Sequence, residues 1–148
     1  MVRHLAGIAE IVDDMDRAVR FYREVLGLAV HYEEGSGYAT VHLPGVLHFG
    51  IWAREKAAES VYGDPQEAWR IPLGFTVGFE VASVDAAAQA VEARGWPVAQ
   101  RPQAELWGQV TSRLFSPSGA LCEIVETPNA RRLVQNVQAR PEPRDGSG

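Results

Sequence analysis

The chain has 148 residues, 46% of them hydrophobic and 22% charged, which fits one globular domain and excludes a disordered chain. Acidic residues outnumber basic ones by 19 to 14, and the net charge of −5 gives no reason to expect a nucleic-acid partner. No apolar run approaches the roughly 20 residues that span a bilayer, and acids interrupt the N-terminal apolar segment, unlike a signal peptide. We therefore expect a cytoplasmic protein with no membrane partner. The single cysteine, Cys122, excludes an internal disulfide.

The first half of the chain predicts a strand, a helix and three further strands. Residues 7–12 form an apolar run, and the acids that follow it, Asp14 and Asp16, favour the start of a helix. Apolar residues then recur at helical spacing over residues 15–26, and Gly27 is a natural C-terminal cap. The remaining strands are predicted at residues 29–33, 38–43 and 46–52.

Residues 54–73 break this pattern and connect the halves, with Asp64 and Pro65 indicating a short helix through Trp69. The second half then repeats the order of the first. Its predicted elements are a strand at 75–81, a helix at 83–94 and strands at 97–101, 109–115 and 120–126. A last helix is predicted over 129–138, followed by a flexible tail.

The two halves are copies of one unit. Asp16 matches Asp85 at an offset of 69 residues (85 − 16), and Val12 matches Val81 at the same offset. Because there are only two large copies, we expect them to join in one domain. The predicted fold is α+β, with two βαβββ modules forming one curved mixed sheet around a central cleft, plus a C-terminal helix. The predicted boundaries are a single domain over 1–128 (module one about 4–53, linker 54–73, module two about 74–127) and a C-terminal helix and flexible tail over 129–148.

Several segments of both halves are similar to those of a known family. DMDRAVRFYREVLGL in the first half, and FEVASVDAAAQAVEARG with WGQ and SPSGALCEIVE in the second, resemble the vicinal oxygen chelate superfamily. This superfamily includes glyoxalase I, bleomycin-resistance proteins and extradiol dioxygenases, and the resemblance covers about residues 4–127. It implies a small-molecule cleft between the modules. Together with the apolar stripe of the predicted last helix, it also implies a homodimer.

The resemblance further implies where a metal would bind. Metal-dependent members place one ligand on the first strand and one on the last strand of each half. Here these positions hold Gly7, Thr76 and Glu123, and either His48 or Phe49 depending on the alignment. Only His48 and Glu123 have side chains suited to a divalent metal, whereas a catalytic site normally takes about three protein ligands. We therefore expect no cofactor in the usual position, with a divalent metal on His48 and Glu123 as the alternative.

Strand alternation indicates which side chains face the cleft. If His48 points inward, so does Trp52, and on the preceding strand Tyr38 and His42 share a face, with His31 one strand further away. Three tryptophans, Trp52, Trp69 and Trp107, are candidates for stacking on a ligand. The predicted ligand-binding residues are Tyr38, His42, His48, Trp52, Trp107, Arg113 and Glu123.

Two acidic residues stand in apolar strands. Glu123 either serves the cleft or pairs with Arg113 on the neighbouring strand, since a buried carboxylate is costly without a partner. Glu10 either marks a bulge or enters the cleft, and the sequence does not decide between these.

Two functions from different classes fit this pattern. The first is a binding protein that holds a small aromatic or amphipathic molecule in the cleft without a metal. The second is a lyase, isomerase or dioxygenase in which His48 and Glu123 act as the catalytic residues, through a metal or through acid–base chemistry.

Overall fold

The computed structural model describes residues 1–128, which form a curved sheet of eight strands flanked by short helices. The first half contributes β1 (Val2–Val12), α1 (Met15–Arg20), the π-helical turn η1 (Phe21–Val25), β2 (Ala29–Tyr32), β3 (Tyr38–His42) and β4 (Phe49–Ala53). The connection forms α2 (Arg54–Tyr62) and the 3₁₀ helix η2 (Pro65–Arg70). The second half contributes β5 (Gly74–Val81), α3 (Val84–Ala93), β6 (Gln100–Ala104), β7 (Val110–Phe115) and β8 (Leu121–Glu126).

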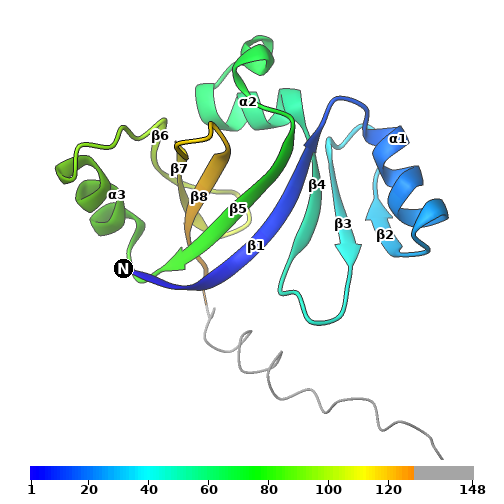
Figure 1. Ribbon diagram of the computed structural model, residues 1–148, viewed down its shortest axis with the longest axis horizontal. Helices are drawn as coiled ribbons and strands as arrows, with labels where there is room; N and C mark the ends of the chain where they lie inside the picture. Colours follow the sequence, from blue (N-terminus) through cyan, green and yellow to red (C-terminus); the bar gives the residue numbers. More distant parts are fainter. Residues whose placement is uncertain (129–148) are drawn as a thin grey trace, which may run out of the picture.

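The sheet is mixed and open, with the strand order β2-β3-β4-β1-β5-β8-β7-β6. At its centre β1 and β5 run antiparallel, while β4 is parallel to β1 and β8 is parallel to β5. Figure 1 shows the two central strands side by side, with α1 and α3 on opposite flanks of the sheet. The predicted α+β fold of two βαβββ repeats in one curved sheet is confirmed. The predicted C-terminal helix and tail, 129–148, lie outside the described residues.

A local two-fold axis relates the two halves. Ile8 pairs with Val77 across β1 and β5, and the same two residues are equivalent in the sequence repeat (77 − 8 = 69). The axis therefore passes through this pair, at the middle of the sheet. Each strand of the first half consequently has a partner in the second, β4 matching β8 and β3 matching β7.

Both repeated helices begin with side-chain caps, of which the sequence predicts Asp14, and cover the convex side of the sheet. The Asp14 side chain accepts the Arg17 N–H at 3.0 Å at the start of α1, and the Ser83 hydroxyl accepts the Ala86 N–H at 3.2 Å at the start of α3. Apolar residues of both helices pack on alternate residues of the strands. The core under α1 includes Val19, Tyr22, Phe49 and Ile51, and that under α3 includes Val84, Ala87 and Ile124.

The segment predicted as a linker contains a helix that the sequence reading missed. α2 packs Ala57, Ala58 and Val61 against Ile11 and Leu121, on the concave side of the sheet. Its first six residues, REKAAE, are strong helix formers, and Gly63 ends it in a left-handed conformation with φ of 74°. Its first turn, however, has no side-chain cap, so the usual start signal is absent. The short helix predicted through Trp69 is confirmed as η2.

No helix among residues 1–128 is long and apolar enough to cross a membrane.

Candidate functional site

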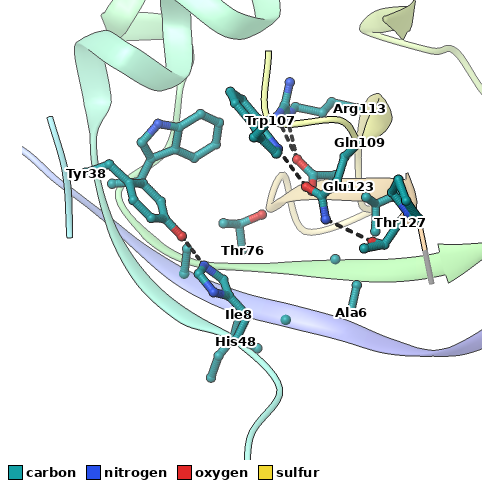
Figure 2. Close-up of a pocket in the computed structure, with 16 residues that line it drawn as sticks. Ala6, Ile8, Tyr38, His48, Thr76, Trp107, Gln109, Arg113, Glu123 and Thr127 are labelled. Carbon is teal, nitrogen blue, oxygen red and sulfur yellow. Dashed lines mark hydrogen bonds and ion pairs between the residues drawn. The ribbon is translucent and has the colours of Figure 1, made fainter. Parts of the chain in front are cut away.

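A pocket of about 720 Å³ lies on the concave side of the sheet, between the two modules. This volume is typical of small-molecule sites. Strands β1, β3, β4, β5, β7 and β8 contribute to its wall, as does the turn between β6 and β7 (Figure 2). Of the seven predicted ligand-binding residues, the structure places six on this wall: Tyr38, His48, Trp52, Trp107, Arg113 and Glu123.

The seventh, His42, is not among the residues that line the pocket. It pairs with Ala29 of β2 and is exposed, because the β3–β4 ladder ends at the pair Thr40–Gly50 and β4 begins only at Phe49. The expectation that His42 faces the cleft was therefore wrong, since strand alternation alone does not show where a neighbouring strand stops. His31 is exposed on the edge strand β2, and Trp69 is 75% exposed on η2, so neither reaches the pocket.

The floor of the pocket is bare backbone where the central strands cross it. Gly7 on β1 and Gly78 on β5 are paired there and both line the pocket. A Cβ at Gly7 would stand 3.0 Å from the His48 carbonyl oxygen and 3.1 Å from the His48 Cβ. Gly7 thus leaves the space that the His48 side chain occupies.

Tyr38 and His48 form a hydrogen-bonded pair at the module-one end of the pocket. The tyrosine hydroxyl and the imidazole Nε2 share a hydrogen bond, and the two rings are parallel within 3° with centroids 5.9 Å apart. Burial raises the pKa of Tyr38, with a further contribution from the charge of Glu123. Burial of the partly accessible imidazole lowers the pKa of His48. Both side chains are therefore held neutral near pH 7.

Arg113 and Glu123 are paired residues of β7 and β8 at the opposite end of the pocket. Oε2 of Glu123 accepts from Nε of Arg113 at 2.9 Å and lies 2.7 Å from its NH2. The Arg113 NH1 group lies 3.4 Å from a carboxylate oxygen of Glu105 and also donates to Gln100. The Arg113 guanidinium thus forms ion pairs with two carboxylates. The pairing that the sequence left open is present, and Glu123 lines the pocket as well.

Burial raises the pKa of Glu123, although Arg113 beside it acts in the opposite direction and Glu105 adds to the rise. The Arg113 side chain is only 3% exposed, whereas that of Glu123 retains 25%, on the pocket side. The carboxylate is therefore the more accessible half of the pair.

A polar chain that the sequence reading missed completes the module-two wall. The Trp107 indole donates to Gln109 at 2.7 Å, and Gln109 donates to the Thr127 hydroxyl at 2.9 Å. The Thr127 N–H and hydroxyl donate to the two oxygens of Glu80 at 2.6 and 2.8 Å. Glu80 is 3% exposed, so Thr127 satisfies a buried acid. An acid at position 80 in the apolar strand FTVGFEV could have indicated a buried polar contact. No feature of the sequence indicated Thr127.

Glu10, whose direction the sequence left open, lies on the convex side of the sheet. It keeps regular register opposite Ile51 and Phe75, so no bulge occurs at this position. Its carboxylate accepts a hydrogen bond from Tyr22 of η1 in the core under the first helix. Burial, and then the bond to Glu10, raise the pKa of Tyr22. Glu10 is thus a structural residue.

The strand register identifies the counterpart of Glu123. Ala9 pairs with Gly50, and the equivalent of Ala9, Gly78, pairs with Glu123. Gly50 is therefore the position equivalent to Glu123, and the alignments that placed His48 or Phe49 there were wrong. The error arises because the turn glycine Gly45 precedes Gly50 by five residues, whereas Gly119 precedes Glu123 by four (50 − 45 and 123 − 119).

The residues at the four equivalent positions do not fit a divalent metal. Gly7 and Gly50 offer no side-chain ligand, and the Thr76 hydroxyl donates to the Leu121 carbonyl. Only Glu123 has a ligand of the right chemistry, and one of its oxygens is occupied by Arg113. In residues 1–128, no group of three His, Cys, Asp or Glu side chains is arranged to hold a metal ion.

The fold defines a class of proteins in which two βαβββ modules form one curved sheet with a pocket between them. The chain belongs to the Glyoxalase/Bleomycin resistance protein/Dioxygenase superfamily, whose model matches residues 4–124. None of the curated proteins compared with the chain matches it.

Solved structures share the fold at low sequence identity. Methylmalonyl-CoA epimerase of Streptomyces coelicolor, in complex with 2-nitronate-propionyl-CoA, is 22% identical, with a TM-score of 0.60 over 87% of this chain and 97% of that one. Methylmalonyl-CoA epimerase of Mycobacterium tuberculosis is 20% identical, with a TM-score of 0.58 over 88% and 93%. A superfamily member from Vibrio splendidus 12B01 is 19% identical, with a TM-score of 0.56 over 84% and 100%.

Proposed function

We propose that this protein binds a small organic molecule in the pocket between its modules, without the metal ion of the metal-dependent superfamily members. The observation that carries the proposal is how the module-one half of the site is filled. The Tyr38 ring lies over Gly50 and the His48 side chain lies over Gly7, at two of the four positions where metal ligands would stand. The aromatic groups Tyr38, Trp52 and Trp107 supply contact surface for a planar ligand.

Metal analysis combined with tryptophan fluorescence tests this function. Protein purified without chelator should contain far less than one divalent metal per chain, and planar aromatic compounds should change its fluorescence in a saturable manner. Trp107→Phe should reduce this response, whereas Trp69→Phe, outside the pocket, should retain it. Stoichiometric metal that is lost on changing Glu123 or His48 to alanine would overturn the proposal.

A second candidate function is acid–base catalysis, as in a lyase or isomerase. The observation that favours it is the placement of two proton-transfer groups across one pocket, with His48 on one module and Glu123 on the other (Figure 2). A neutral imidazole can accept a proton near pH 7. The likeness to epimerases makes CoA thioesters the first compounds to try. Exchange of a substrate hydrogen in D₂O that disappears in both His48→Gln and Glu123→Gln would establish catalysis; its absence across a panel would favour binding alone.

The proposal includes the cytoplasmic location and the homodimer expected from the sequence. Sedimentation velocity of the full chain tests the second, and a monomer at micromolar concentration would contradict it.

A further inference from the structure

The charged side chains around the pocket are one arginine and two carboxylates, and this imbalance affects which ligands the pocket can bind. Arg113 is the only arginine or lysine that lines the pocket within residues 1–128. Its Nε and NH2 groups face Glu123, and its NH1 group faces Gln100 and Glu105. The ring of Trp52 covers the guanidinium, whose carbon lies 5.2 Å from the ring centroid. A carboxylate or phosphate entering the pocket would therefore meet a guanidinium that already faces two carboxylates and an amide.

The opposite charge is in excess at the same place. Glu105, with a side chain 7% exposed, and Glu123 both face the single guanidinium, so the cluster has a net charge of −1 when both carboxylates are ionised. An unbalanced buried charge is unfavourable unless a further partner compensates it. At the other end of the pocket, the neutral Tyr38–His48 pair adds no charge.

One oxygen of this cluster remains available to a ligand. Both contacts from Arg113 go to Oε2 of Glu123, and Oε1 accepts no hydrogen bond from residues 1–128. Oε1 lies 3.7 Å from where a Cβ on Gly78 would stand, so it is directed over the bare glycine floor of the pocket. Because Gly78 has no side chain, nothing from β5 covers this oxygen.

We propose that the pocket binds organic cations, namely molecules with an apolar or aromatic body and a protonated or quaternary nitrogen that faces Oε1 of Glu123. The cation compensates the second carboxylate around Arg113, and the aromatic groups Trp107 and Tyr38 on the pocket wall contact the body. This inference rests on the small-molecule binding proposed above and names the ligand class of that pocket.

Three probes that share one body and differ in charge test the proposal by calorimetric titration of the full chain. They are (2-naphthylmethyl)trimethylammonium, 2-naphthylmethanol and 2-naphthylacetate. The cation should bind at least about tenfold more tightly than the alcohol, as for interactions with a charged partner, and the anion most weakly. Binding in which the alcohol equals the cation, or the anion is tightest, overturns the cation proposal and leaves small-molecule binding intact. Failure of all three to bind overturns both.

Two variants localise the effect. Glu123→Gln keeps the shape of the side chain and should reduce the preference for the cation over the alcohol about tenfold. Gly78→Val leaves every charge in place but covers Oε1, and should produce the same loss of preference. Glu92→Gln removes a surface carboxylate that pairs with Arg101 at 3.2 Å, and should change nothing. The proposal is overturned if the cation preference persists in the pocket variants. If one variant folds poorly, the other still provides the test.

Discussion

Tyr38 lies across Gly50, so that a Cβ on the glycine would overlap the tyrosine hydroxyl and the end of its ring. Gly50 is the symmetry counterpart of Glu123, which means that the two modules have used equivalent positions in opposite ways. In module two the strand supplies a carboxylate. In module one the strand has no side chain at this position, and the Tyr38 ring from the neighbouring strand fills the space. The Tyr38 hydroxyl forms its hydrogen bond with His48 from there.

A double-mutant cycle measures this dependence. Gly50→Ala should lower the free energy of unfolding by about 1–3 kcal/mol, because the added methyl displaces Tyr38 from its bond with His48. In a Tyr38→Ala background the same change should cost much less, giving a coupling energy of about 0.5–3 kcal/mol. Urea unfolding of the four proteins provides the values.

Gly78→Ala is the matched control for this cycle, because a Cβ there has its nearest neighbours at 3.7 Å, an ordinary contact. Equal losses at Gly50 with and without the Tyr38 ring would contradict the packing described.

The general architecture was predictable because it depends on patterns that the sequence displays directly. Apolar periodicity, the cap Asp14 and the offset of 69 residues were enough for the strands, both repeated helices and the curved sheet. Boundaries were less certain, and β6 lies three residues later than expected, at Gln100–Ala104 rather than 97–101. Its ladder with β7 is irregular between Gln100 and Gln103, which alternation does not reveal.

The pocket was only partly predictable, because its residues meet through strand register. Alternation identified Tyr38, His48 and Trp52 as side chains of one face, but it could not show that the β3–β4 ladder ends before His42. Nor could it show that Thr127, one residue past β8, would bond to a buried acid on β5. Contacts between residues 47 positions apart depend on tertiary structure alone.

Without the Arg113 guanidinium, the buried carboxylates should lower the free energy of unfolding. Arg113→Met keeps much of the aliphatic volume but leaves Glu105 and Glu123 without their shared cation. We expect a loss of about 3–5 kcal/mol in urea unfolding, as for other broken buried ion pairs. In a background with both carboxylates changed to glutamine, the loss should be much smaller.

The surface pair provides the comparison for this experiment. Arg101, with a side chain 79% exposed, pairs with Glu92 at 3.2 Å, and Arg101→Met should leave stability within about 0.5 kcal/mol of the parent. A similar small effect at Arg113 would show that the cluster is hydrated in solution.

The pH dependence of His48 follows from the partial desolvation of its ring in the pocket. Because burial lowers its pKa in the folded protein, the unfolded chain binds more protons between the folded pKa and about 6.5. The contribution of His48 to stability is therefore complete above this window and is lost as the pH falls through it. An NMR titration should show an imidazole with a midpoint below 6.5, and His48→Gln should remove this resonance. A midpoint at or above 6.5 would contradict the partial desolvation of the ring.

Restoring a metal ligand on the first strand tests whether the module-one half of the site is closed to metal. Gly7→His introduces a ligand of the type that the superfamily uses, but its Cβ would stand 3.0 Å from the backbone oxygen of His48. Since that oxygen also accepts the Ile8 N–H at 3.1 Å, it cannot move freely. We expect the variant to lose about 1–3 kcal/mol, most of which Gly7→Ala should reproduce, since the clash is at Cβ. Thermal unfolding with and without excess zinc completes the test. A ligand that binds the folded state raises Tm, and the stabilisation grows with the logarithm of its concentration over Kd. We expect an unchanged Tm, and a zinc-dependent rise of several degrees would show that the position still accepts a metal.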